Sequence, residues 1–114
     1  MKVEDLVSAL QAEMKCGAGQ SGNPVTGAYC SDLLSDVMAH AQKDDLWITI
    51  QTHQNIVAVA SLLELAGIII TGGGSPDPET ITKAVKENIP VLTSELSSFE
   101  VAGRLYCLLG KDAG

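Results

Sequence analysis

Short runs rich in aliphatic and β-branched residues alternate with helical segments along most of this chain. The clearest runs lie at residues 46–50, 68–71 and 90–94. The run IIIT, at 68–71, has no alternation with polar residues, which is typical of a strand covered on both faces of a sheet. Parallel neighbours need long return connections, and right-handed crossovers place helices over the sheet. The alternation therefore predicts an α/β fold with a mostly parallel sheet.

Apolar spacing and capping residues locate the helices between these strands. The spacing predicts an amphipathic first helix over residues 3–15, and Ser31 or Asp32 can cap a second helix. The third, IVAVASLLELA, is apolar on nearly every side and is expected to be buried. Asp77 followed by proline begins a fourth. The capping box at 97–100 begins a fifth, whose inward residues are predicted to be Phe99, Ala102, Leu105 and Leu109.

A further short strand at 25–30 completes the predicted architecture, a small three-layer sandwich with a four-stranded, mostly parallel sheet and flanking helices. We expect residues 1–24 to form a helix and a glycine-rich linker packed on the domain. Residues 25–110 form the α/β domain itself, and residues 111–114 form a frayed tail.

The stretch GAGQSG, at residues 17–22, fits the G-x-G-x-x-G pattern of dinucleotide-binding proteins. That pattern works when a strand enters the glycine turn and a helix leaves it, because the amides at the helix N-terminus hold the pyrophosphate. In this chain a helix is predicted before the glycines and a strand after them. We therefore interpret the stretch as a linker.

Charge and cysteine content exclude several classes of protein. The net charge is −7, with 14 acidic and 7 basic residues, which argues against binding to nucleic acid or to an anionic membrane surface. The cysteines, Cys16, Cys30 and Cys107, are odd in number and lack C-x-x-C spacing, so we predict neither disulfides nor a metal site. The sequence has neither a signal-peptide pattern nor a membrane-spanning stretch, and a cytoplasmic location is expected.

The predicted ligand site lies beyond the carboxyl ends of the parallel strands, where open α/β sheets bind ligands. The glycine turn after the strand at 68–71 leads into a helix, so its amides could receive an anion, or it could simply be a tight turn. QTHQN, at 51–55, could bind a ligand, or Thr52 or Asn55 could cap the next helix. The candidate residues are Ser31, Asp32, Thr52, His53, Gln54, Asn55, Thr71, Gly72, Gly73 and Gly74.

Catalysis has one weaker candidate. Cys30 and His53 both follow predicted strands, and a thiol beside an imidazole can act as a nucleophile. His40 falls at the end of its helix, where a cation complements the dipole. We predict no catalytic residue, cofactor or metal.

The segment GIIITGGGSPDPETITKAVKENIPVL resembles the DRTGG domain family, and the resemblance covers about residues 25–105. Thr71, Gly72 and Gly73 match the second half of the family name, whereas Thr52 and His53 stand where the Asp-Arg half is expected. The resemblance implies a fold similar to the N-terminal domain of HPr kinase. It also implies a non-catalytic, dimeric module in adenine-nucleotide-regulated enzymes. The stand-alone members are similar to proteins encoded near iron-only hydrogenases.

Two hypotheses follow from the residues and the resemblance together. The first is a homodimeric regulatory module that binds a small ligand or anion at the carboxyl edge of the sheet. The resemblance to the family implies an adenine nucleotide as that ligand. The second is an adaptor that binds a partner protein of a hydrogenase or another redox complex. A thiol enzyme using Cys30 is the third and weakest.

Overall fold

A computed structural model describes residues 1–110 and shows a five-stranded sheet between two layers of helices. The strands are β1 (Ala12–Cys16), β2 (Gly27–Cys30), β3 (Asp45–Thr49), β4 (Gly67–Ile70) and β5 (Val91–Ser94). Their order across the sheet is β1-β5-β4-β3-β2, and β1 alone runs antiparallel to its neighbour. The predicted three-layer α/β sandwich is confirmed, with one strand more than expected.

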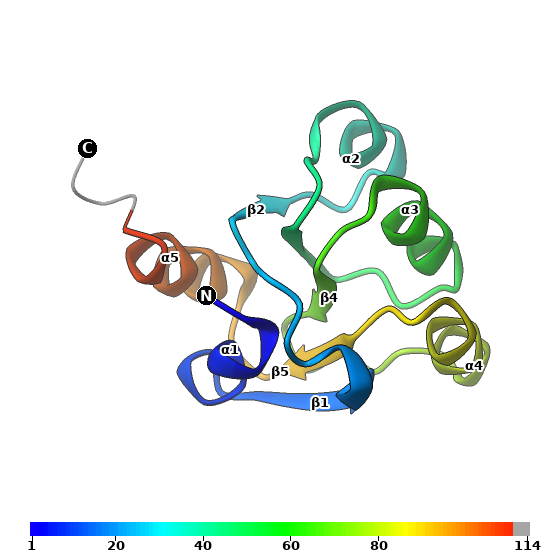
Figure 1. Ribbon diagram of the computed structural model, residues 1–114, viewed down its shortest axis with the longest axis horizontal. Coiled ribbons are helices and arrows are strands. Elements are labelled where there is room, and N and C mark those ends of the chain that lie inside the picture. The colour runs from blue at the N-terminus through cyan, green and yellow to red at the C-terminus, as the bar shows by residue number, and fades with distance from the viewer. Residues whose placement is uncertain (111–114) are drawn as a thin grey trace.

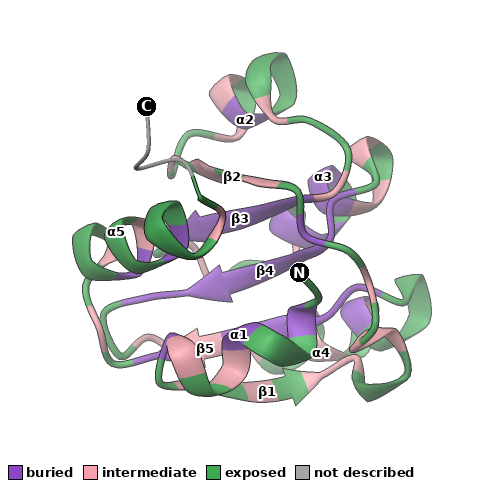
Figure 2. Ribbon diagram, turned by 60° about the vertical axis from the view of Figure 1, so that its left-hand side comes forward, coloured by how far each residue is buried: buried purple, intermediate pink, exposed green. Residues whose placement is uncertain are grey.

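Helices cover both faces of this sheet. They are α1 (Val3–Ala9), α2 (Leu34–His40), α3 (Asn55–Leu63), α4 (Pro78–Glu87) and α5 (Ser98–Leu108), and a short 3-10 turn, η1, spans Ala18–Gln20. Figure 1 shows α1 and α5 on one face and α2, α3 and α4 on the other. Successive residues of the central strands feed two cores, so that Trp47 packs under α2 and α3 whereas Ile48 packs under α5. The buried strands lie in the middle of the molecule (Figure 2).

The predicted helix over 3–15 is wrong beyond its second turn. The chain leaves the helix through Gln11, which has a positive φ of 49°, and then forms β1 against β5. In β1 the half-buried residues Ala12 and Met14 alternate with Glu13 and Lys15, which are more exposed. The position of Met14 fits both a helical and a strand periodicity. The segment forms a strand because the edge of β5 would otherwise be unpaired.

Two predictions of burial also need correction. Phe99 was expected to point inward, but it is 86% exposed because α5 turns Val101 and Leu105 toward the sheet. Phe99 lies two residues before Val101, about 200° around the helix from it. In α3 the buried residues are Ile56, Val57, Val59 and Ala60, whereas Leu62, near its end, is 66% exposed.

The observed helix caps match the caps predicted from the sequence only in part. Ser97 caps α5, accepting the Glu100 amide at 3.2 Å, as the capping box predicts. Neither Ser31 nor Asp32 is the N-cap of α2, because that helix begins after Leu33. Likewise the N-cap position of α3 is Gln54, whereas Thr52 or Asn55 was the predicted cap.

Candidate functional site

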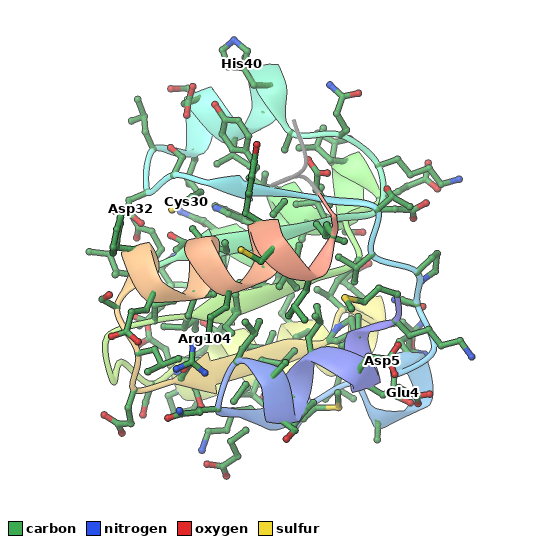
Figure 3. All side chains as sticks on the ribbon, turned by 90° about the vertical axis from the view of Figure 1, so that its left-hand side faces the viewer. Glu4, Asp5, Cys30, Asp32, His40 and Arg104 are labelled. Carbon is green, nitrogen blue, oxygen red and sulfur yellow. The ribbon has the colours of Figure 1, made fainter. Side chains whose placement is uncertain are left out.

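The loops that follow β2, β3, β4 and β5 meet at one edge of the sheet, as their parallel order requires. Asp32, in the loop after β2, lies at this edge in Figure 3. Its Oδ1 accepts hydrogen bonds from the Thr49 hydroxyl and from the Ile50 amide, both at 2.9 Å. Its backbone carbonyl accepts one from Gln51 Nε2, also at 2.9 Å. Asp32 therefore ties the end of β2 to the end of β3, and its predicted ligand role stays a prediction.

Ser31 also contributes to the structure of this corner. Its carbonyl accepts a hydrogen bond from the Trp47 indole at 2.8 Å, which satisfies the one polar group of that buried ring. Its hydroxyl accepts the Leu33 amide at 3.2 Å. Ser31 thus fixes the entry into α2 without serving as its cap.

The QTHQN loop is held in place by hydrogen bonds from the start of α4. The Thr52 carbonyl accepts hydrogen bonds from the Asp77 amide at 3.1 Å and from the Thr80 hydroxyl at 2.6 Å. His53 Nδ1 accepts the Asn55 amide at 3.1 Å, which leaves the proton of a neutral ring on Nε2. The histidine therefore supplies the hydrogen bond at the start of α3 that the sequence assigned to Thr52 or Asn55.

The glycine turn after β4 uses part of its hydrogen-bonding capacity internally. The Gly72 amide donates to the Leu96 carbonyl at 2.8 Å, and the Gly73 amide donates to the Ser94 carbonyl at 3.1 Å. Both glycines have positive φ values, 71° and 81°. The Thr71 hydroxyl lies 2.6 Å from that of Ser98 at the start of α5. These bonds define a rigid turn, so an anion would have to contact Gly74 and the residues after it.

The two predicted loops lie side by side. A methyl group added at Gly74 would stand 3.8 Å from Thr52 Cγ2 and 3.3 Å from Ile70 Cγ2. A methyl group at Gly73 would stand 2.8 Å from Glu95 Oε2, in the loop after β5. Thr52, Gly73, Gly74 and Glu95 are thus close neighbours, whereas His53 is turned into its own helix start.

A small polar cavity opens beside the glycine turn, and we call it the edge pocket. Its volume is about 200 Å³. It is lined by Gln11, Ala12, Glu13, Lys15, Gly73, Gly74, Ser75, Thr93, Ser94 and Glu95. The side chain of Lys15 is two-thirds covered and its Nζ lies 3.2 Å from Glu13 Oε1. The sequence interpretation missed Lys15 and Glu13 because it placed them in a helix; the alternation of Ala12 to Cys16 was the available signal.

The chain's arginine does not fill the place of the missing Asp-Arg half. Arg104 lies on α5, beside α1, in Figure 3. Its guanidinium donates to the Ala9 carbonyl at 3.1 Å and lies 3.7 Å from Glu100. Lys15 is therefore the basic residue that lines the edge pocket.

The thiol hypothesis receives no support from the geometry. Burial and the nearby negative charge of Asp32 raise the pKa of Cys30, which lowers its thiolate fraction. Cys30 and Asp32 lie close together in Figure 3. No interaction joins Cys30 to His53 within residues 1–110. Over the same residues, no group of three or more His, Cys, Asp or Glu side chains is arranged to bind a metal ion.

A second polar cluster surrounds Asp36 in α2. The Tyr29 hydroxyl donates to Asp36 Oδ2 at 2.9 Å, and His40 Nδ1 lies 3.0 Å from Oδ1. Hydrogen bonds from Ser31, Tyr29 and His40 lower the pKa of Asp36, while the carboxylate raises the pKa of Tyr29. His40 stands in the last turn of α2, as expected from the sequence. The hydrogen bond between Tyr29 and Asp36 connects α2 to the edge strand β2.

The structure is thus a small three-layer α/β domain with a glycine turn at one edge of its sheet. The chain belongs to the DRTGG domain family, whose model matches residues 5–107. The matched TGG residues are Thr71, Gly72 and Gly73, at the turn after β4.

A solved structure shares this fold. It is the regulatory region of Clostridium perfringens pyrophosphatase, with its CBS and DRTGG domains, in complex with the activator diadenosine tetraphosphate. The TM-score is 0.73 at 22% sequence identity, and the match covers 91% of this chain and 45% of the other. The chain thus spans less than half the length of that neighbour. No curated protein matches the sequence. Within the described part of the chain, no helix is long and apolar enough to cross a membrane.

Proposed function

We propose that this domain is a non-catalytic regulatory module that binds a nucleotide through its phosphates in the edge pocket. The observation that carries the proposal is the position of Lys15, which β1 places in the same small polar cavity as Gly74 and Ser75. The membership in the DRTGG family supports a regulatory role. The activator bound to the pyrophosphatase regulatory region, a dinucleoside polyphosphate, supports the class of ligand.

The size and lining of the edge pocket fit a phosphate group better than a whole nucleotide. A cavity of about 200 Å³ lies below the usual range for drug-sized ligands, so the nucleoside part would lie outside it. Lys15 supplies a positive charge, and the hydroxyls of Ser75 and Thr93 supply donors. Lys15 would exchange its contact with Glu13 for one with the phosphate.

Two carboxylates in the edge pocket determine in which form the phosphate binds, bare or as a magnesium complex. Glu13 and Glu95 line the cavity with Lys15, so the charge of these three groups sums to −1. A bare phosphate would be repelled, whereas a Mg²⁺ ion carried by the nucleotide binds one or two carboxylates together with phosphate oxygens. We therefore propose the magnesium complex of the nucleotide as the ligand.

Calorimetric titration of the purified protein with ATP and with diadenosine tetraphosphate, each with Mg²⁺ and with EDTA, tests the proposal. We expect saturable binding that requires Mg²⁺, and at least a tenfold loss of affinity in Lys15→Ala, since a charged hydrogen bond contributes about 1.5–3 kcal/mol. Lys43→Ala is the matched control, because Lys43 pairs with Glu64 at 3.8 Å on an exposed surface.

Glu95→Gln separates the two ways of binding phosphate. If Mg²⁺ bridges Glu95 and the ligand, this variant weakens binding; if a bare phosphate binds, removing the negative charge strengthens it and binding survives EDTA. Equal affinities of the wild type and Lys15→Ala, with unchanged thermal unfolding, would contradict the proposal.

A second surface favours association with another protein. Leu33 and Ile50 are 64% and 58% exposed, and both adjoin the hydrogen bonds that Asp32 makes at the carboxyl edge. Phe99, 86% exposed, follows Ser98 at the same edge. Contiguous exposed apolar side chains mark contact surfaces, and we propose that these three residues form one. We propose that it contacts a second copy of the chain, in a reducing, cytoplasmic setting consistent with three free cysteines.

Sedimentation equilibrium tests this association. The wild type is expected to be a dimer and Phe99→Glu a monomer with the same unfolding midpoint. Leu62→Glu, at a leucine of α3 that is 66% exposed, is expected to remain dimeric. A wild type that is monomeric but co-purifies with a hydrogenase component would favour the adaptor function instead.

A further inference from the structure

The sheet ends on one side in β1 and on the other in β2, and only β1 is built to resist pairing with a further strand. β1 carries the charged side chains of Glu13 and Lys15, and its register is broken between Met14 and Cys16. Charges and a broken register are common features that keep an edge strand from pairing with another chain. β2, with the sequence GAYC, has no charge, no proline and no break in register. Within residues 1–110, no strand pairs with its outer edge.

Alternate residues of β2 direct their backbone groups toward this outer edge. The Ser31 amide donates to the Ile48 carbonyl of β3 at 3.2 Å. The direction of the amide and carbonyl groups alternates along a strand, so those of Ala28 and Cys30 point away from β3. Both residues are exposed. Each therefore presents one donor and one acceptor to an added strand.

A cavity lies beside β2 on the face of the sheet that α5 covers, and we call it the α5 pocket. Its volume is about 520 Å³. Its apolar wall consists of Ala28, Cys30, Ile48, Ala102, Tyr106 and Leu109, and polar residues complete the lining. Ala28 and Cys30 lie in register with Leu46 and Ile48, which belong to the core under α5. Because side chains alternate between the faces of a sheet, every second side chain of an added strand would lie on the side of this pocket.

The surface around the outer edge of β2 is acidic. The segment 25–41, which includes β2 and α2, contains Asp32 and Asp36 and no Lys or Arg. Figure 3 shows Asp32 close to Cys30, whereas Arg104 lies between α5 and α1. A second copy of the chain would bring the same carboxylates to this edge and carries a net charge of −7. A segment with Lys or Arg would complement them.

We propose that the outer edge of β2 binds an extended, basic segment of a partner protein as an added strand, with a large apolar side chain of that segment in the α5 pocket. In strand addition the main-chain hydrogen bonds supply affinity, and pockets for alternate side chains supply specificity. The outer edge of β2 offers both, through the backbone groups of Ala28 and Cys30 and through the α5 pocket.

Titration of the isotope-labelled protein with blocked peptides tests the proposal. The probes are Lys-Val-Ala-Val-Lys, Lys-Val-Leu-Val-Lys, Lys-Val-Phe-Val-Lys and the acidic counterpart Glu-Val-Leu-Val-Glu. We expect the basic peptides with Leu or Phe to bind best and the acidic one to bind about tenfold more weakly or not at all. Binding should protect the amides of Ala28 and Cys30 from hydrogen exchange, which insertion of a side chain into the pocket alone would not do.

Ala28→Pro removes one outward amide, and a proline is tolerated on an edge strand where the lost N–H faces solvent. We expect it to weaken binding of the Leu peptide about tenfold. Ala28→Ser keeps the amide and is the matched control, with unchanged affinity. Ala102→Phe narrows the α5 pocket and is a second, independent variant. It should weaken binding of the Leu and Phe peptides and leave the Ala peptide unaffected.

Three results would overturn the inference. The first is that no peptide protects the amides of Ala28 and Cys30 at millimolar concentration. The second is equal affinity of Ala28→Pro and Ala28→Ser for the Leu peptide. The third is a wild-type dimer that Ala28→Pro dissociates in sedimentation, since the occupant of the edge would then be a second copy. Lys15→Ala, on the opposite edge strand, should leave peptide binding unchanged, so failure of the nucleotide proposal is distinguishable from failure of this one.

Discussion

The side chain of Asp32 connects the loop after β2 to the end of β3 at the carboxyl edge. Its Oδ1 accepts from the Thr49 hydroxyl and the Ile50 amide, and Thr49 is fully buried. Asp32→Ala leaves a buried hydroxyl without its acceptor, so we expect a loss of about 1–3 kcal/mol in the free energy of unfolding. Asp32→Asn retains one oxygen and should lose less. Urea unfolding measures both; equal losses would show that the hydrogen bonds at Oδ1 contribute little.

The ionisation of Asp36 makes the stability of the fold depend on pH. Its pKa in the folded protein is lowered from 3.8 by hydrogen bonds from Ser31, Tyr29 and His40. The ionised carboxylate therefore stabilises the fold at pH values above 3.8, and this contribution disappears as pH falls through the lower, folded-state pKa. Asp36→Asn should be less stable than the wild type at neutral pH.

The difference in urea midpoint between Asp36→Asn and the wild type should narrow between neutral pH and about pH 3. Asp44→Asn is a suitable control, because Asp44 has a positive φ of 68°, which asparagine tolerates, and no part in this cluster. A midpoint difference that stays constant with pH would mean that the hydrogen bonds favour neither charge state.

Among the elements, the junction between β1 and η1 explains why glycine stands at position 17. Gly17 has a φ of 92°, and a Cβ there would lie 2.4 Å from Pro90 Cα. Gly17→Ala should therefore cost roughly 2–4 kcal/mol, by strain and by displacement of Pro90. Gly19, by contrast, has no atom near its Cβ position, and Gly19→Ala should change stability by no more than about 0.5 kcal/mol.

Denaturant unfolding of the two variants checks this difference. Similar midpoints would mean that the chain can shift at Gly17 without cost. Gly17 is thus explained by its positive φ and by its packing against Pro90. The stretch GAGQSG was predicted to link a helix to a strand, but in the structure it follows the strand β1 and contains η1 before the chain reaches β2.

The strands and helices from β2 onward could be predicted because their apolar patterns are local. The run at 68–71 is buried on both faces, and the capping box at Ser97 marks the start of α5. Two features could not be predicted in this way. The strand β1 depends on the open edge of β5, which is remote in sequence, and the outward direction of Phe99 depends on how α5 rotates on the sheet.

The candidate site shows the same limit at the scale of the whole molecule. The parallel order brings the predicted loops to one edge, and the contact between Gly74 and Thr52 follows from it. Which backbone amides are already bonded, and which distant side chain enters the pocket, depends on packing between separate layers. Lys15 joins the site only because β1 pairs with β5, on the far side of the sheet from β2.

The N-terminal segment is part of the core, so the molecule should not fold without it. Val3, Leu6 and Leu10 are fully buried in the same cluster as Leu92 and Leu105. Removal of one such leucine side chain costs about 2–5 kcal/mol, and a domain has only about 5–15 kcal/mol in total. Removal of residues 1–16 would delete all three side chains and β1, the antiparallel partner of β5.

We therefore expect the chain lacking residues 1–16 to show no cooperative unfolding by circular dichroism, because the lost burial exceeds the stability available. Full-length Leu6→Ala is the graded control and should still unfold cooperatively, with a lower midpoint. A cooperative transition in the truncated chain would show that residues 25–110 form an independent unit on which the N-terminal segment is only packed. The edge pocket would then lose Gln11, Ala12, Glu13 and Lys15 while the domain survived, and nucleotide binding by that fragment would test whether these residues of the N-terminal segment are needed together.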